Sequence, residues 1–191
     1  MASTAESGGP AETRIVAARR DEAALPVLCA EGAERAREAS VRMTLKGAVL
    51  LRASLPRQRA DRREPLLVTG RPGRGDLLAI EYGDGGTVRF CFDHWGGALM
   101  RSDPLPVDFD RPQEIRIAME SLRPPAPFRS NRVVVHGQLE VWLNGRSVWR
   151  VGGEFFAVNP VEIAVGQNPI GGTSCGPEFT GVVHGFEAVA R

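Results

Sequence analysis

Hydrophobic and polar residues alternate on both sides of a glycine-rich turn, Gly83–Gly86. Three alternate apolar residues precede the turn and three follow it: Leu78, Ile80, Tyr82, Val88, Phe90 and Phe92. Alternation of this kind is typical of a β-strand with one buried side. Glycine readily adopts the positive φ angles of a tight turn. The pattern therefore predicts a β-hairpin over Leu77–Asp93.

The same alternation, punctuated by turn residues, continues through most of the chain. Asn144 and Gly145 form a favoured two-residue hairpin turn between two alternating runs. The further predicted strands are Thr13–Ala18, Val41–Leu55 with an interruption at Gly47, Leu66–Thr69, Glu114–Met119, Gln138–Leu143, Ser147–Val151, Val161–Val165 and Phe179–Ala190. About ten short strands with frequent turns predict an antiparallel all-β sandwich or barrel.

Length and composition are consistent with one large all-β domain. The chain has 191 residues, of which 42% are hydrophobic, and one such domain can reach about 200 residues. We expect residues 1–12 to be a disordered tail and residues 13–191 to form a single domain. Only Glu31–Ala39 has helical composition, and Arg123–Arg129 is a proline-rich loop. A long connection is marked by Pro104, Pro106 and Pro112.

Charge and cysteine usage exclude several classes of protein. Lys and Arg number 24 against 23 Asp and Glu, so the net charge of +1 favours neither nucleic acid nor an anionic membrane as partner. No apolar run reaches the roughly 20 residues of a membrane span, and the N-terminus lacks a signal-peptide pattern. We expect a soluble chain, alone or within a larger exported protein; no oligomeric state is predicted. Cys29, Cys91 and Cys175 leave one disulfide open, without a zinc-ligand spacing.

The order of the segments resembles the concanavalin A-like lectin/glucanase superfamily, nearest its laminin-G-like and pentraxin-like members. The segments that carry the resemblance are FDHWG (Phe92–Gly96), EIRIAM (Glu114–Met119), LEVWLNGRSVW (Leu139–Trp149), VEIAVGQNPIGG (Val161–Gly172) and FTGVV (Phe179–Val183). The resemblance covers roughly residues 41–191. It implies an antiparallel jelly-roll β-sandwich whose first and last strands pair, and a binding module more often than an enzyme.

Glucanases of this superfamily carry their catalytic carboxylates on alternate residues of one strand. Here the alternate positions are Glu114, Arg116 and Ala118, so a cation and a methyl group occupy two of the three positions. Glu120 lies one step too far along the strand. Because glycoside hydrolysis needs two carboxylates that flank the scissile bond, we expect no enzyme activity. Ile115, Ile117 and Met119 are expected to face the core.

Three further motifs are better explained by local structure than by chemistry. Gly172–Gly176 matches G-x-S-x-G, but no helix is expected after Ser174, and no base is expected to activate Cys175. The RGD tripeptide Arg74–Asp76 lies where a turn needs those residues. The arginine cluster 57–63 is interrupted by Asp61, which favours a solvated loop over an anion site.

Calcium is the one metal that the resemblance makes plausible, since many laminin-G-like and pentraxin-like domains hold it with oxygen ligands. The loop candidates are Asp93, Asp103, Asp108, Asn168 and Glu178. They form no dense cluster in the sequence, so the metal question stays open. His94, His136 and His184 lack metal-ligand spacing.

The aromatic residues give the best functional indication. Asp93, His94 and Trp95 combine a stacking ring with polar groups at the end of the central hairpin, and Asn168 is a candidate neighbour. Trp142 alternates with inward Leu and Val residues, so it is expected on the polar face of a sheet, where it is a further candidate ligand-binding residue. We therefore expect a non-catalytic, carbohydrate-binding module with a glycan or protein ligand. The alternatives are a structural or protein-interaction domain of a larger bacterial protein and, less favoured, a glycoside hydrolase.

Overall fold

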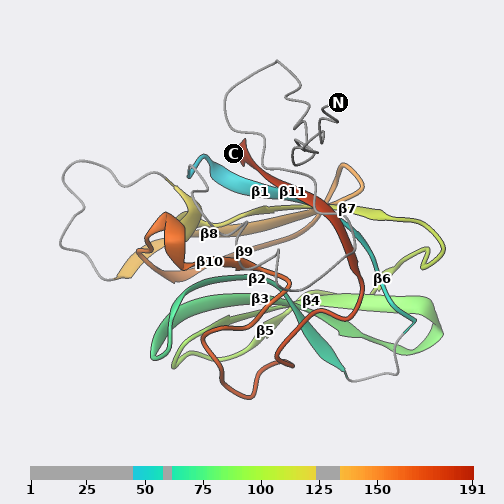
Figure 1. The fold of residues 1–191 in the computed structure, drawn as a ribbon, viewed down its shortest axis with the longest axis horizontal. Helices are drawn as coiled ribbons and strands as arrows, with labels where there is room; N and C mark the ends of the chain where they lie inside the picture. Colours follow the sequence, from blue (N-terminus) through green and yellow to red (C-terminus); the bar gives the residue numbers. More distant parts are fainter. Residues whose placement is uncertain (1–44, 58–61, 124–133) are drawn as a thin grey trace, which may run out of the picture.

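The computed structural model describes residues 45–57, 62–123 and 134–191, which form eleven strands in two antiparallel sheets. Figure 1 shows the sheets as two stacked layers. The all-β sandwich predicted from the alternation is thereby confirmed. The predicted tail 1–12, the strand Thr13–Ala18, the helix Glu31–Ala39 and most of the loop Arg123–Arg129 lie outside the described residues.

Sheet A has the strand order β11-β1-β7-β8-β9. Its strands are β1 (Gly47–Ser54), β7 (Gln113–Ala118), β8 (Val134–Leu143), β9 (Arg146–Phe156) and β11 (Val182–Ala190). The first and last described strands pair, with Gly47 opposite Ala190, as the resemblance implied. Asn144, with φ 51°, and Gly145, with φ 81°, make the turn between β8 and β9, as predicted from their sequence.

Sheet B has the order β10-β2-β3-β4-β5, and β6 also pairs with β4. Its strands are β2 (Arg63–Arg71), β3 (Arg74–Tyr82), β4 (Thr87–His94), β5 (Met100–Arg101), β6 (Leu105–Pro106) and β10 (Ile163–Val165). The predicted central hairpin is β3–β4. Three short 3-10 turns complete the described elements: η1 (Asp84–Gly86), η2 (Glu120–Leu122) and η3 (Pro160–Glu162).

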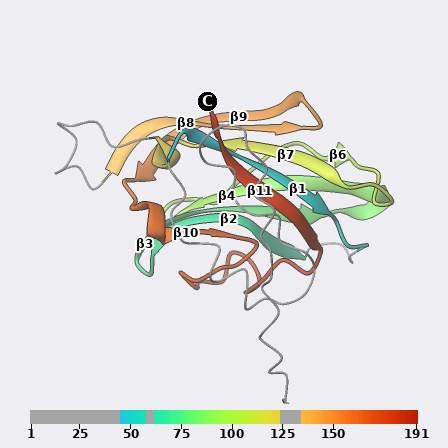
Figure 2. The same ribbon diagram turned by 45° about the horizontal axis from the view of Figure 1, so that its top comes forward.

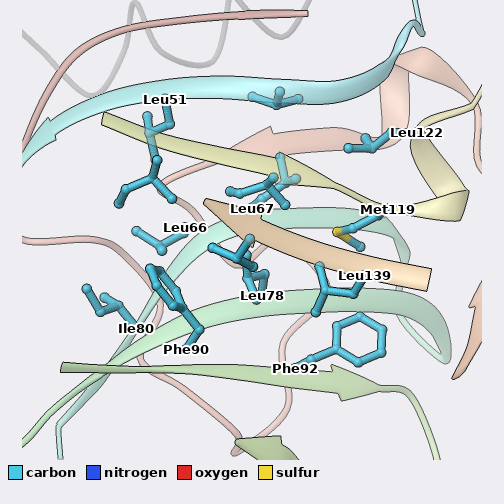
Figure 3. Packing of buried hydrophobic residues seen from close by; sticks show 14 of the residues in the cluster. Leu51, Leu66, Leu67, Leu78, Ile80, Phe90, Phe92, Met119, Leu122 and Leu139 are labelled. Atoms are coloured by element: carbon cyan, nitrogen blue, oxygen red, sulfur yellow. The ribbon is translucent and has the colours of Figure 1, made fainter. Parts of the chain in front are cut away.

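Figure 2 shows the two sheets from a second direction. The hydrophobic core lies between them, and both sheets contribute residues to it (Figure 3). The fully buried members include Leu51, Leu67, Leu78, Ile80, Phe90, Phe92, Ile115, Ile117, Met119 and Leu139. Phe92 of sheet B meets Phe155 of sheet A with ring centroids 5.3 Å apart. The alternation read from the sequence therefore identified the inward faces of both sheets.

Several strand boundaries differ from the sequence prediction. Gly47 begins β1 with φ 102° instead of interrupting a longer strand. Val161 belongs to η3, so β10 has only three residues. Phe179 precedes β11 and is buried in the core. The connection that carries Pro104 and Pro106 contains the short strands β5 and β6. No described helix is long and apolar enough to cross a membrane.

A second, smaller apolar cluster lies on the outer face of sheet B. Val68, Leu77, Ala79 and Cys91 point away from the main core and are covered by Ile170. Ile170 belongs to the segment 166–178, named here the covering loop, which connects β10 to the chain before β11. In Figure 1 this orange-to-red segment runs beyond the green strands of sheet B. A sheet face that would otherwise meet solvent is thereby buried.

Among the glycines of the sheet A strands, Gly137 leaves the least space for an added methyl group. A Cβ at this position would lie 2.5 Å from Cβ of Glu120, whose buried carboxylate meets Arg123 and Arg191, each at 3.2 Å. Gly137→Ala should lower the free energy of unfolding by about 1–3 kcal/mol through overpacking. Gly153, directly opposite in β9, has only Met100 at 3.7 Å, so Gly153→Ala is the matched control. Equal urea-unfolding midpoints for the two variants would contradict this account.

Candidate functional site

The chain turns sharply at the end of β4 and presents one tryptophan to solvent. The Trp95 amide donates to Gly75 O at 3.0 Å, and the Gly97 amide donates to His94 O at 2.7 Å. Gly96, with φ 85°, adopts a conformation that favours glycine. The Trp95 side chain is held at a rigid hairpin end, yet it is 38% exposed. An indole fixed in this way is suited to stacking on a ligand.

Asp93 and His94 point to opposite sides of sheet B because successive strand residues alternate. The His94 ring turns toward sheet A, where it stacks on Phe156 with centroids 4.3 Å apart. Its Nδ1 lies 2.7 Å from Oδ1 of Asp76, and Oδ2 of Asp76 accepts the Phe156 amide at 2.9 Å. His94 therefore connects the two sheets instead of lying beside Asp93 on the outer face.

Asp76 is fully buried in this connection. Burial penalises the charged carboxylate and raises its pKa to about 6, against the opposing hydrogen bonds from His94 and Phe156. This environment also explains the RGD tripeptide. The Asp76 carboxylate is occupied inside the fold, and Arg74 donates to Ala157 O at 3.3 Å. The tripeptide does not present its acidic group to a receptor.

The covering loop is anchored at both ends and in the middle. The Gly166 amide donates to Leu66 O, and the Gly176 amide donates to Arg63 O. Gln167 and Glu178 form an isolated antiparallel bridge. Between these anchors Ile170 sits over Gly75, where a Cβ would lie only 3.0 Å from Cδ1 of the isoleucine. These contacts fix the loop against sheet B.

The middle of the covering loop lies beside the end of β4. The Ser174 hydroxyl donates to Oδ2 of Asp93. A Cβ at Gly172 would lie 3.9 Å from Cζ3 of Trp95. Gly171 and Gly172 both have positive φ, and both are exposed. The structure thus brings Asp93, Trp95 and the exposed backbone of the covering loop together; we name this region the Trp95 site.

Asn168 shapes the covering loop from inside. Its side chain brackets Gly171, because Oδ1 accepts the Gly171 amide and Nδ2 donates to the Gly171 carbonyl, both at 3.1 Å. Nδ2 also lies 3.6 Å from Sγ of Cys175. Asn168 therefore positions the glycines beside Trp95. Both polar atoms of its side chain are engaged in these hydrogen bonds.

Trp142 lies on the other side of the sandwich from Trp95. As predicted from its alternation with Val141 and Leu143, it occupies the outer face of sheet A. The guanidinium of Arg116 lies 4.2 Å from its ring centroid and also donates to Ala190 O at 3.0 Å. The two tryptophans cannot belong to one binding site.

Glu140 also lies on the outer face of sheet A. It accepts hydrogen bonds from Arg150 at 2.7 Å and from Ser147 at 2.9 Å. Burial disfavours its charged form, but these bonds and the charges of Arg150 and Arg191 outweigh that effect and lower the pKa of Glu140. The outer face of sheet A thus combines one stacked tryptophan with paired charges.

The strand that resembles the glucanase motif carries no pair of facing carboxylates. Glu114 meets Arg52 at 3.5 Å, Arg116 stacks on Trp142, and Ala118 is buried. The Ser174 hydroxyl donates to an aspartate, not to a base of the kind that activates a nucleophilic serine. Most of the arginine cluster is paired: Arg57 with Asp110, Arg62 with Glu64, and Arg63 with Glu81.

The two described cysteines are free thiols. Burial raises the pKa of Cys91 to about 12 and that of Cys175 to about 11. Both are therefore protonated and weakly nucleophilic at neutral pH. Cys29 lies outside the described residues.

The calcium candidates are dispersed over the structure. Asp108 accepts the Asp110 amide at 2.9 Å and meets Arg111 at 3.4 Å. Glu178 lies near Asn168, whereas Asp93 is held by Ser174. Within the described ranges, no three His, Cys, Asp or Glu side chains converge as metal ligands. The described residues thus provide no carboxylate-rich calcium site of the usual kind.

The raised pKa of Asp76 predicts that the stability of the protein depends on pH. This pKa rises from 3.8 to about 6 on folding, so the folded state holds the proton more tightly. The stability that this proton contributes is complete below about pH 4 and is lost as the pH rises through 6. Relative to Asp76→Asn, the wild-type free energy of unfolding should fall by about 2 kcal/mol between pH 4 and 7.

Urea unfolding at four pH values in that interval measures this difference. The exposed Asp103 supplies the control, since Asp103→Asn should keep the wild-type profile. Parallel profiles for wild type and Asp76→Asn would show that the buried carboxyl does not titrate in this range.

Comparisons with known proteins concern the fold. No protein-family model matches the chain, and no curated protein does. Among solved structures, it is similar to the CBM40 module of the Ruminococcus gnavus IT-sialidase bound to alpha2,3 sialyllactose, at 15% identity and TM-score 0.48, covering 80% of this chain and 79% of that one. It is also similar to the heptameric SAP-like pentraxin of Limulus polyphemus, at 12% identity and TM-score 0.43, covering 74% and 60%.

A third similar structure is an engineered GH43 glycoside hydrolase, at 17% identity and TM-score 0.40, covering 73% of this chain and 28% of the hydrolase. The chain thus spans about 60% of the pentraxin's length and less of the hydrolase's. At these identities and TM-scores the likeness concerns the general fold alone and says nothing of the ligand.

Proposed function

We propose that this chain is a non-catalytic carbohydrate-binding module and that the Trp95 site holds the sugar. The observation that carries the proposal is the exposed indole of Trp95, held at a rigid hairpin end beside the glycine-rich covering loop. A pyranose presents an apolar C–H face and a rim of hydroxyls. A fixed aromatic plane complements the face, while nearby polar groups complement the rim.

The polar partners in this proposal are Asp93 and the backbone of Gly172 and Thr173. Ser174 occupies one oxygen of Asp93 and orients the carboxylate, which has acceptor capacity left for sugar hydroxyls. The Gly171 amide is already bonded to Asn168, so the backbone groups offered to a ligand are those of Gly172 and Thr173, which a ligand can approach closely because Gly171 and Gly172 lack side chains. The Asp93 carboxylate and the loop backbone offer directional hydrogen bonds to the hydroxyls of a neutral sugar unit.

His94 and Asn168 act indirectly in this proposal. His94 bonds to Asp76 and stacks on Phe156. It thereby fixes the end of β4, from which Asp93 and Trp95 project. Asn168 brackets Gly171 and so sets the path of the covering loop. Both are positioning residues, not ligand contacts.

A protein-interaction domain is the second candidate, and the outer face of sheet A favours it. Trp142 and Arg116 form a flat stacked pair there, flanked by charged side chains. Tryptophan and arginine are the residues most enriched in interface hot spots. In this alternative Trp142→Ala, and not Trp95→Ala, abolishes the interaction.

The carbohydrate proposal is tested by a glycan-array screen followed by calorimetry on a glycan that binds. Trp95→Ala should weaken binding by roughly tenfold or more, since stacking contributes about one or more kcal/mol. Its free energy of unfolding should change by less than about 1 kcal/mol, because the ring is exposed. Trp95→Phe should retain part of the affinity, and Trp142→Ala should retain it all. Parallel screens with calcium and with a chelator test the metal.

Two results would count against this site. One is unchanged glycan affinity in Trp95→Ala. The other is a variant that unfolds far more easily and binds normally once folded, which would make Trp95 a packing residue.

The absence of catalysis is a separate prediction. With Arg116 and Ala118 in place of acids, the pure protein should release no reducing sugar from laminarin, lichenan, agarose or a glycan that it binds. An active glucanase assayed beside it shows that the substrates are competent. Release that disappears in Glu114→Gln would reverse the assignment to a glycoside hydrolase.

A further inference from the structure

A second concave region lies at the two ends of the covering loop. It has a volume of about 640 Å³. Its lining comes from the end of β2 (Gly70, Arg71), from η3 and β10 (Val161, Ala164), and from the two ends of the covering loop (Gln167, Glu178). We name this region the β10 groove.

The β10 strand is the outer edge of sheet B, and its backbone groups are unpaired on one side. Ile163, Ala164 and Val165 pair with β2 alone. The Gly166 amide donates to Leu66 O at 3.0 Å, which continues this ladder. Because bonded and non-bonded pairs alternate in an antiparallel ladder, Ala164 faces β2, whereas Ile163 and Val165 direct their N–H and C=O groups to the edge.

The two ends of the groove carry opposite charges. Extending the register of β10 on β2 places Arg71 beside Val161, at the start of the segment. Glu178 pairs with Gln167, at its end. Across the ranges that the structure covers, neither the Arg71 nor the Glu178 side chain has a hydrogen-bond or ion-pair partner. Each charge is thus available to a ligand.

We propose that the β10 groove binds an extended peptide segment, which adds to β10 as a further antiparallel strand. The edge groups of Ile163 and Val165 would supply the main-chain hydrogen bonds that strand addition uses. The depression over Ala164 would take alternate small apolar side chains of the peptide. Arg71 and Glu178 would select an acidic residue near the C-terminal end of the peptide and a basic residue near its N-terminal end.

The peptide would pair with only three residues of β10, Ile163–Val165. Beyond Val165 the chain pairs with itself, because the Phe179 amide donates to Gly166 O at 2.8 Å and Gln167 bridges Glu178, and before Ile163 it forms the turn η3. A seven-residue antiparallel peptide would therefore pair through its middle residues, with its first residue directed toward Glu178 and its last toward Arg71. Its third and fifth residues lie opposite Val165 and Ile163. The amides of these two peptide residues therefore face β10. The side chains of the second, fourth and sixth peptide residues lie on the same face of the sheet as Ala164.

Fluorescence anisotropy with the capped peptide acetyl-Lys-Val-Thr-Val-Thr-Val-Glu-amide, carrying a fluorophore, tests the proposal on the full chain. We expect saturable binding below about 1 mM, and binding at least roughly tenfold weaker when the terminal Lys and Glu are exchanged. The protein variant Arg71→Glu/Glu178→Lys should invert this preference. Both residues are exposed, so the variant should fold as the wild type does.

Strand addition has its own test, because charge alone can attract a peptide. N-methylation of the third and fifth amides removes the donors that face β10 and should abolish binding, whereas N-methylation of the second and fourth should not. Val165→Pro removes one edge donor and no ladder donor, and should also abolish binding.

The proposal is overturned by no binding at 1 mM, by a charge preference that the swapped variant does not invert, or by equal effects of the two N-methylation patterns. Trp95→Ala serves as the matched control, since it should leave peptide affinity unchanged whether or not it affects glycan binding.

Discussion

Ile170 makes the apolar contact on which both proposed sites of this protein depend. Its side chain is 5% exposed and covers Val68, Leu77 and Cys91 on the outer face of sheet B. Burial of an isoleucine side chain contributes about 1.5–3 kcal/mol. That contribution offsets part of the conformational entropy that a glycine-rich segment loses on folding. Backbone bonds at Gly166 and Gly176 fix the ends of the loop, and Ile170 fixes its middle against sheet B, so the loop forms a wall of both the Trp95 site and the β10 groove.

Two buried carboxylates complement this apolar anchor. Asp76 joins His94 of sheet B to the Phe156 amide of sheet A. Glu64, also fully buried, accepts hydrogen bonds from the Tyr82 hydroxyl and from both the amide and the hydroxyl of Thr180. Buried charge is costly unless it is fully paired. These carboxylates therefore serve mainly to specify one arrangement of the two sheets and of the chain that leads into β11. Their net contribution to the free energy of unfolding is smaller.

The sequence was sufficient for the features that depend on neighbours in the chain. Alternation identified the β3–β4 hairpin and the outward direction of Trp142, and Asn144-Gly145 identified a turn. The sequence does not show contacts between residues far apart in the chain. It places His94 beside Asp93, whereas the structure shows the His94 ring against Asp76 on the neighbouring strand and Phe156 on the other sheet. The G-x-S-x-G pattern likewise gives no sign that Ser174 bonds Asp93, 81 residues away in the sequence.

The covering loop serves both candidate sites, and this determines which variants can separate them. Its middle, Gly171 to Ser174, borders Trp95, while its two ends border the β10 groove. Asn168 lines the groove and brackets Gly171, so Asn168→Ala would disturb both sites and would assign a function to neither. Trp95 follows β4, and Arg71 ends β2; both are held by sheet B independently of the loop's internal hydrogen bonds. Substitutions at these two positions can therefore distinguish a sugar site from a peptide site on the same molecule.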